Sequence, residues 1–88
     1  MCKICQDILL SEKFYSSKDW LDCLRYMKLL LDRGEFELVA STCDIDKVKA
    51  NGKWVNDIIQ HSIQCKTCGQ IFICYANTYQ GGGAFRKA

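Results

Sequence analysis

Two Cys-x-x-Cys pairs stand near the two ends of this 88-residue chain. Cys2 and Cys5 form the first pair, and Cys65 and Cys68 form the second. A Cys-x-x-Cys turn directs two thiolates at a common point, and two such turns supply the four ligands of the tetrahedral site that Zn²⁺ prefers. Gly69 follows the second pair, where a glycine lets the backbone pass close to the sulfurs. The pattern predicts a structural zinc ion held by all four cysteines.

The separation of the two pairs has a consequence for the fold. Between Cys5 and Cys65 lie 59 residues, which is much more than a compact zinc ribbon contains. The entropy of closing a loop grows by only about 0.6 kcal/mol per doubling of its length, so the spacing is allowed. A folded insert must then lie between the pairs. Three alternatives stay open: a site formed by one pair, a disulfide, or unconnected cysteines in the core.

The remaining histidine and cysteines are candidates for other chemistry. His61, the only histidine, would lie about 13 Å from Cys65 along a strand, too far to share a metal ion with it. We expect it to be hydrogen-bonded in a sheet or to contact a partner. Cys23 and Cys74 are interpreted as core residues. Cys43, in a polar segment, is the one candidate for a reactive thiol. A cysteine hydrolase would need a Cys43–His61 pair, which nothing in the local sequence supports, so we expect no enzymatic activity.

The best-supported element is a helix over residues 18–33. Ser16 offers an N-cap and Gly34 a stop signal. On the polar side, Lys28 and Asp32 are spaced for an ion pair one turn apart. The apolar positions fall at helical spacing on one stripe, which consists of Trp20, Cys23, Leu24, Met27, Leu30 and Leu31.

Three segments carry strand formers in partly alternating order: residues 36–41, 58–64 and 70–76. The turn 65–69 would join the last two as a hairpin. One face of the middle segment and its end is predicted to consist of Ile59, His61, Ile63 and Cys65. The fold class is therefore α+β. We expect one main helix packed on a small antiparallel sheet, with a zinc-knuckle hairpin joining the two ends, and residues 1–88 forming a single zinc-stapled domain.

The rest of the chain is less clearly patterned. Residues 6–16 form either a short helix or an irregular segment, from which Ile8, Leu9 and Leu10 would pack inward. Asn51-Gly52 is a tight-turn signal. The glycines 81–83 predict a break in the chain, followed by an edge strand with a solvated end.

Composition and charge limit the classes of partner. The net charge is +2, and four thiolates with Zn²⁺ would add −2, which leaves the metal-bound chain close to neutral. Proteins that bind nucleic acid through phosphates usually carry a basic face. The seven cysteines, an odd number, and the lack of a long apolar segment favour a reducing compartment. We therefore expect a cytoplasmic protein with no membrane association.

The two Cys-x-x-Cys pairs give the chain a resemblance to zinc-ribbon or rubredoxin-type knuckle proteins with an inserted helix. The first pair departs from that pattern, since Gln6 stands where a glycine follows the second pair. The resemblance implies metal binding by the four cysteines and no particular activity. The run 61–72, with 79–83 beyond it, also resembles small bacterial immunity proteins, which neutralise a toxin by binding it.

The leading hypothesis is a non-catalytic, zinc-binding interaction module with one protein partner. In its narrower form the chain is a bacterial inhibitor or immunity protein, and the partner is a toxin domain. The alternative is a zinc ribbon that binds nucleic acid, with phosphate contacts from Lys47, Lys49, Lys53, Arg86 and Lys87. A third hypothesis is a redox or metal-sensing role in which thiol oxidation releases zinc. Iron is the alternative metal for four cysteines.

Overall fold

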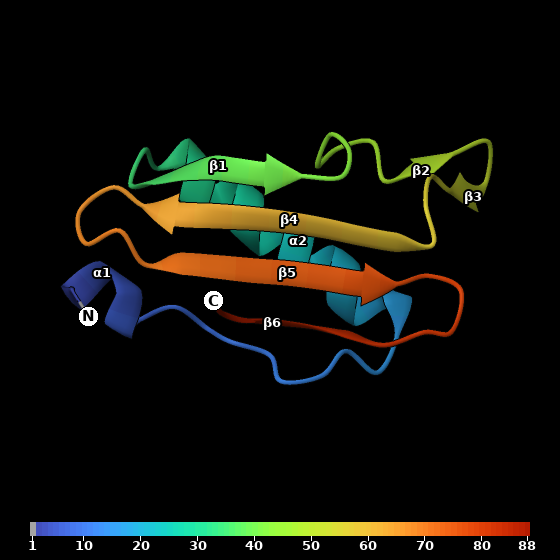
Figure 1. The fold of residues 1–88 in the computed structure, drawn as a ribbon, viewed down its shortest axis with the longest axis horizontal. Coiled ribbons are helices and arrows are strands. Elements are labelled where there is room, and N and C mark those ends of the chain that lie inside the picture. Colours follow the sequence, from blue (N-terminus) through green and yellow to red (C-terminus); the bar gives the residue numbers. More distant parts are fainter. Residues whose placement is uncertain (1) are drawn as a thin grey trace.

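The computed structural model describes residues 2–88, so the first residue of the predicted domain lies outside the described residues. It contains two helices and six strands over these residues (Figure 1). In chain order they are α1 (Lys3–Gln6), α2 (Ser17–Asp32), β1 (Phe36–Ser41), β2 (Lys49–Ala50), β3 (Lys53–Trp54), β4 (Ile58–Cys65), β5 (Ile71–Asn77) and β6 (Gly83–Lys87).

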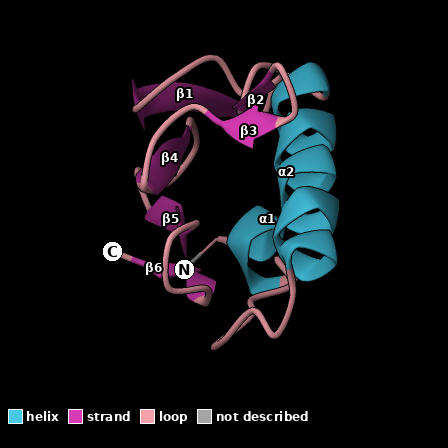
Figure 2. Cartoon of the chain, turned by 90° about the vertical axis from the view of Figure 1, so that its right-hand side faces the viewer, coloured by secondary structure: helices cyan, strands magenta, loops and turns pink. Residues whose placement is uncertain are grey.

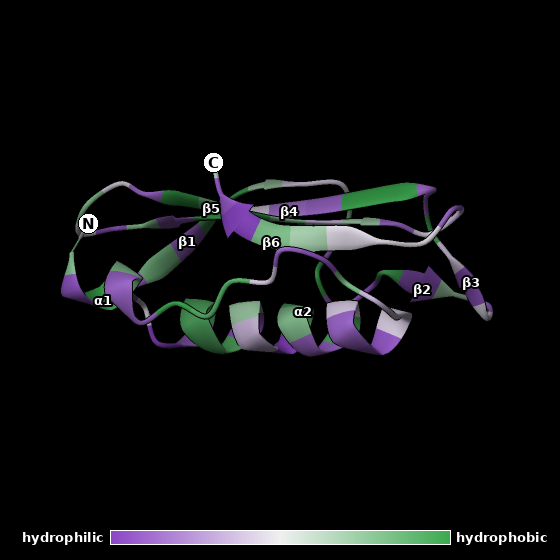
Figure 3. Cartoon of the chain, turned by 90° about the horizontal axis from the view of Figure 1, so that it is seen from below, coloured by the Kyte–Doolittle hydropathy of each residue, from purple (hydrophilic) through white to green (hydrophobic). Residues whose placement is uncertain are grey.

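Four strands form one antiparallel sheet in the order β1-β4-β5-β6. Helix α2 lies along one face of this sheet, as two perpendicular views show (Figures 2 and 3). Strands β2 and β3 pair separately as a small hairpin beyond one end of the sheet (Figure 1). The predicted α+β class is confirmed, including the main helix and the antiparallel sheet.

Local sequence explains the bounds of α2. Ser16 caps the helix, because its hydroxyl oxygen accepts a hydrogen bond from the backbone N–H of Asp19. The helix ends at Asp32, before Gly34, so its bounds are one residue earlier than predicted at each end. The fully buried part of the predicted stripe consists of Trp20, Leu24, Met27 and Leu30. Cys23 and Leu31 lie at its margin and are partly buried.

The core lies between α2 and the inner face of the sheet. Phe72 of β5 has no exposed surface, and its ring lies 6.1 Å from the ring of Phe36 and 6.0 Å from that of Phe85. The predicted inner face of β4 is confirmed, since each of its members is at least 99% buried: Ile59, His61, Ile63 and Cys65. Helix and sheet are thus held together by a continuous apolar layer.

Two local expectations were wrong. Leu9 and Leu10 are 73% and 44% exposed, although they were expected to pack inward. The segment runs along the edge of the sheet, where Ser11 forms a bridge with Phe85, and Phe14 fills the core in their place. Pairing with β6 fixes this segment at the edge of the sheet, so its two leucines do not lie between α2 and the sheet.

The second error concerns an ion pair. Lys28 does not contact Asp32; its ammonium donates to a carboxylate oxygen of Asp46 at 2.8 Å. The loop between β1 and β2 brings this carboxylate to the helix, and the hydrogen bond with Asp46 raises the pKa of Lys28. A tertiary contact has replaced the local pairing that the sequence favoured.

The tail forms the edge strand that the sequence predicted, but Gly83 belongs to β6 and not to the break before it. A side chain at this position would overlap the carbonyl oxygen of Tyr75, because β6 lies very close to β5 here. Its φ of 144° is also one that side-chain-bearing residues rarely adopt. Glycine at position 83 is therefore required for pairing of β6.

Candidate metal centre

The four cysteines of the two predicted pairs meet at one end of the sheet. Their sulfur atoms all lie within 4.8 Å of one another. The sulfur of Cys2 is 3.7 Å from that of Cys65, and the sulfur of Cys5 is 3.4 Å from that of Cys68. Tetrahedral zinc with Zn–S bonds of about 2.3 Å requires sulfurs about 3.8 Å apart. The spacing fits a four-thiolate site, and each close contact joins one end of the chain to the other.

The first pair is presented by the single turn of α1. Cys2 is the N-cap residue and Cys5 lies in the helix, so the two side chains project from the same side one turn apart. The N–H of Gln6 donates to the carbonyl oxygen of Cys2 at 3.1 Å. Because the chain continues as helix through Gln6, no glycine is needed at this position. This explains the departure from the zinc-ribbon pattern.

The second pair lies in the turn between β4 and β5. Cys65 ends β4, and its N–H donates to the carbonyl oxygen of Gln70 at 2.9 Å. The N–H of Gly69 donates to the carbonyl oxygen of Cys65 at 2.9 Å, and Gly69 has a φ of 80°. This left-handed conformation favours glycine. The turn predicted for residues 65–69 is confirmed.

Backbone N–H groups are directed at two of the sulfurs. Burial alone would raise the pKa of Cys65. Hydrogen bonds from the N–H groups of Cys68 and Thr67 and from the thiols of Cys5 and Cys2 together outweigh burial, and the pKa is lowered. Hydrogen bonds from the N–H groups of Gln70 and Cys2 lower the pKa of Cys68 to about 6. Donors of this kind stabilise a thiolate and are typical neighbours of metal-bound sulfur.

The thiol of Cys5 is the one in the cluster that is hardest to ionise without a bound cation. Burial, followed by hydrogen bonds with the thiols of Cys68, Cys65 and Cys2, raises the pKa of Cys5. A thiolate at this buried position is therefore unfavourable unless a positive ion neutralises it. Cys68 is exposed, whereas Cys5 and Cys65 are buried, so the cluster opens to solvent on one side. An ion could enter from that side.

Neighbouring hydrogen bonds hold the second turn in place. The N–H of Lys66 donates to the carbonyl oxygen of Glu35 at 3.0 Å, which fixes the turn to the connection between α2 and β1. The side-chain amide of Gln64 donates to the carbonyl oxygen of Gly69 at 3.0 Å. The ligands are thus positioned by the sheet and by the end of the main helix.

His61 does not belong to the cluster, as the strand geometry predicted. Its Nε2 lies 2.8 Å from the carbonyl oxygen of Cys43, so the ring donates to the loop that follows β1. Burial lowers the pKa of His61, and Nδ1 is buried with no hydrogen-bond partner among residues 2–88. The alternative of a hydrogen-bonded sheet residue is therefore confirmed.

The other three cysteines also lie outside the cluster. Burial and the nearby charge of Asp44 raise the pKa of Cys43, which is the opposite of thiol activation. Cys74 is fully buried, and its pKa is raised by a hydrogen bond with the thiol of Cys23 and by burial. The sequence interpretation missed the proximity of Cys23 and Cys74. Their predicted positions, on the inner sides of the helix and of the sheet, were the signal that could have found it.

Four of the five basic residues of the nucleic-acid hypothesis form two separate groups, and the fifth, Lys47, lies in the loop before β2. Lys49 and Lys53 belong to the β2–β3 hairpin beyond one end of the sheet (Figure 1). Arg86 and Lys87 end β6, where Lys87 pairs with Phe72 toward the cysteine cluster. The guanidinium of Arg86 also donates to the hydroxyl of Tyr75 at 3.1 Å. These residues therefore do not combine into one basic face.

Comparisons with known proteins give no match from which the role of the site could be inferred. None of the helices described in residues 2–88 has both the length and the apolar character needed to cross a membrane. No family model, no curated protein and no solved structure matches the chain.

Proposed function

We propose that Cys2, Cys5, Cys65 and Cys68 hold a structural zinc ion, and that the fold stapled by this ion is a non-catalytic module that binds one protein partner. The observation that carries the proposal is the convergence of four thiols from both ends of the chain within 4.8 Å. Four protein ligands complete a tetrahedral shell. Such an ion has no open position for water or substrate, so its role would be to hold the fold.

The architecture gives zinc a clear structural task. Helix α1 has only four residues, far fewer than an isolated helix needs for stability in water. The cluster would fix this turn to the β4–β5 turn and so tie the N-terminal segment to the sheet. A chain of this size has a small core, and a metal staple is a common means of stabilising such folds.

The surface favours a protein over a nucleic acid as the partner. The metal-bound chain would be close to neutral, and the basic residues of the nucleic-acid hypothesis do not combine into one basic face. Large apolar and aromatic side chains are exposed in the described residues, among them Leu9, Tyr15, Ile58 and Tyr79. Tyrosine is enriched at the energetic centres of protein interfaces. In the narrower form of the proposal the partner is a toxin domain that the chain neutralises, as the resemblance to immunity proteins implies.

The test is native mass spectrometry of the tagged chain purified gently from its own host. One zinc ion per chain and a stoichiometric protein are expected. Cys43→Ser, outside the cluster, should keep both, whereas Cys68→Ser should lose the zinc. Co-purifying nucleic acid in place of a protein would refute the choice of partner, and a metal-free chain would refute the zinc staple. If the partner alone arrests growth and co-expression of the chain relieves the arrest, the narrower form is supported; a partner that is harmless alone would contradict it.

A further inference from the structure

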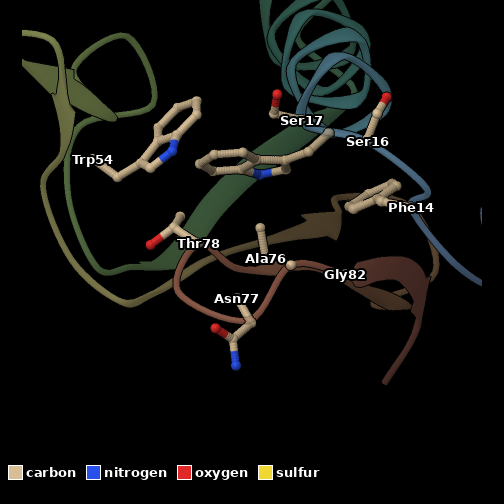
Figure 4. A pocket seen from close by; sticks show the side chains of 10 residues that line it. Phe14, Ser16, Ser17, Trp54, Ala76, Asn77, Thr78 and Gly82 are labelled. Atoms are coloured by element: carbon tan, nitrogen blue, oxygen red, sulfur yellow. The ribbon is translucent and has the colours of Figure 1, made fainter.

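A small cavity lies at the opposite end of α2 from the cysteine cluster. It is bounded by the start of α2, the β3 strand and the connection from β5 to β6 (Figure 4). Its volume is about 80 Å³. The residues that line it carry no charge: Phe14, Ser16, Ser17, Trp20, Trp54, Ala76, Asn77, Thr78, Gly81 and Gly82. They come from three separate parts of the chain, so the cavity is a product of the tertiary fold.

Aromatic rings form the walls of this cavity. The rings of Trp20 and Trp54 lie 5.0 Å apart and are tilted by 56°. Figure 4 shows Phe14 and Trp54 on opposite sides of the space and the methyl group of Ala76 at its floor, whereas Asn77 is directed away. Both tryptophans of the chain line the cavity. An apolar group would meet aromatic surface on several sides.

The size of the cavity limits what it can hold. Sites for cofactors and drug-sized ligands usually have about 300–1,000 Å³, whereas a single water needs about 10–15 Å³. A volume of about 80 Å³ lies between these limits and suits one amino-acid side chain. Side chains that anchor an interface commonly enter a pocket of this kind.

One lysine lies at the rim of the cavity, and further exposed residues adjoin the lining residues in sequence. Lys49 pairs with Trp54, and its ammonium lies 5.1 Å from the centre of the Trp54 ring. The exposed Lys53 precedes Trp54 in the β3 strand, so its side chain projects from the opposite face of that strand. Beside Phe14, the ammonium of Lys13 lies 5.6 Å from the ring of Tyr15, which is 83% exposed. Tyr79, next to the lining residue Thr78, is 81% exposed.

Two acidic residues also lie near the rim. Asp19 accepts a hydrogen bond from the N–H of Tyr15 at 3.0 Å, so one of its carboxylate oxygens is already engaged. Asp57 is exposed, and its carbonyl oxygen accepts from the N–H of Thr78. The ammonium of Lys49 stands over a ring that lines the cavity. It offers one contact to a carboxylate at the edge of the cavity, while the cavity itself accepts an uncharged group.

We propose that this cavity docks one aromatic side chain from an acidic segment of the protein partner, with a flanking carboxylate directed at Lys49. This inference rests on the proposed function, since it names the surface and the chemistry of the same partner. It assigns the two ends of the molecule different tasks: zinc at one end stabilises the fold, and the cavity at the other end binds.

The test uses the zinc-loaded full chain and three short peptides of the same length. Their sequences are Asp-Asp-Phe-Asp-Asp, Lys-Lys-Phe-Lys-Lys and Asp-Asp-Gly-Asp-Asp, each blocked at both ends. The indole N–H signals of Trp20 and Trp54 in nitrogen–proton correlation spectra report directly on the cavity. Only the acidic phenylalanine peptide is expected to shift both signals in a saturable manner, with at least about tenfold tighter binding than the other two.

Matched variants separate the rim from the rest of the surface. Lys49→Glu, at the rim, should weaken binding of the acidic peptide several-fold. Lys87→Glu makes the same change of charge on β6 and should leave binding unchanged. Trp54→Ala removes one wall and should abolish binding while the Trp20 signal still reports a folded chain. Equal binding by the acidic and basic peptides, equal effects of the two lysine variants, or no shift with any peptide would overturn the inference.

Two further outcomes distinguish this inference from the proposed function. If a short oligothymidine strand shifts the indole signals and the acidic peptide does not, the cavity end binds single-stranded nucleic acid, and the inference is wrong. If a partner is isolated and Trp54→Ala and Lys49→Glu bind it as tightly as the unaltered chain, the proposed function stands but its surface lies elsewhere.

Discussion

Replacing Cys68, the exposed cysteine of the proposed zinc site, by serine is the cleanest test of that site. Cys68 lies on the surface, so the smaller polar side chain costs little by itself. Cys65 is 1% exposed, and a serine there would also bury a hydroxyl group, at a cost of about 1–3 kcal/mol. Cys68→Ser therefore isolates the loss of the metal, whereas Cys65→Ser adds a packing defect to it.

The expected loss of stability follows from the length of the loop that a bound ion would close. The close sulfur contacts join residues 63 positions apart in both cases. Treated as a covalent cross-link, a loop of this length restricts the unfolded chain by about 4 kcal/mol. Small domains are stable by only about 5–15 kcal/mol in total. Loss of the ion should therefore remove a large share of the stability and lower the melting temperature by roughly 15–30 °C.

The assay is thermal unfolding with and without a zinc chelator, together with the zinc content of each sample. The unaltered chain should contain one zinc ion, and the chelator should lower its melting temperature to about that of Cys68→Ser. The variant itself should not respond to the chelator. Cys43→Ser, a half-buried cysteine outside the cluster, should behave like the unaltered chain. The reasoning fails if Cys68→Ser keeps one tightly bound zinc ion, or if the chelator leaves the melting temperature of the unaltered chain unchanged.

Three other perturbations test the fold. Gly83→Ala should lower the free energy of unfolding in urea by more than about 2 kcal/mol, because the new methyl group would overlap the Tyr75 carbonyl oxygen. At Gly34 no atom lies within 4 Å of the new methyl group, so Gly34→Ala should be less destabilising. Equal losses for the two variants would contradict this reasoning. Phe72→Ala should cost about 3–5 kcal/mol, and a loss below about 1 kcal/mol would show that this residue is not central to the core. Burial lowers the pKa of His61, so below about pH 6.5 the unfolded chain binds more protons than the folded chain. The free energy of unfolding should therefore fall as the pH drops from about 7 to about 5, by at most about 1.4 kcal/mol per pH unit. His61→Gln should show a smaller fall than the unaltered chain under the same conditions, and identical slopes would exclude a contribution from the histidine.

The elements that the sequence located well are those with strong local signals. The capping serine and the apolar stripe placed α2 to within one residue, and the strand formers of residues 36–41 gave the bounds of β1. The alternation in 58–64 also identified the buried face of β4. The cysteine spacing also predicted which four sulfurs would converge, because a Cys-x-x-Cys turn constrains its own geometry.

The errors arose where a distant segment decided the outcome. Leu9 and Leu10 read as core residues, but the position of their segment is set by pairing with β6, which follows more than 70 residues later. Lys28 has a suitable partner one helical turn away in Asp32, but it forms its ion pair with Asp46 of the loop between β1 and β2. Neither outcome leaves a periodic signal, so composition and spacing could not reveal them.

The separation of the metal centre from the aromatic cavity bears on how the chain works. Strand β5 begins at Ile71, just after the turn that carries Cys65 and Cys68, and ends at Asn77, one of the residues that line the cavity. At about 3.4 Å per residue it places the two features about 20 Å apart. A zinc ion at the four cysteines would therefore be too distant to contact a group in the cavity, and it would influence binding only through the stability of the sheet. The cavity walls depend on packing between Trp20 and Trp54, and neither residue belongs to the cysteine cluster. A metal-free chain that still folds at low temperature should thus keep its peptide affinity, and lose it only in parallel with global unfolding.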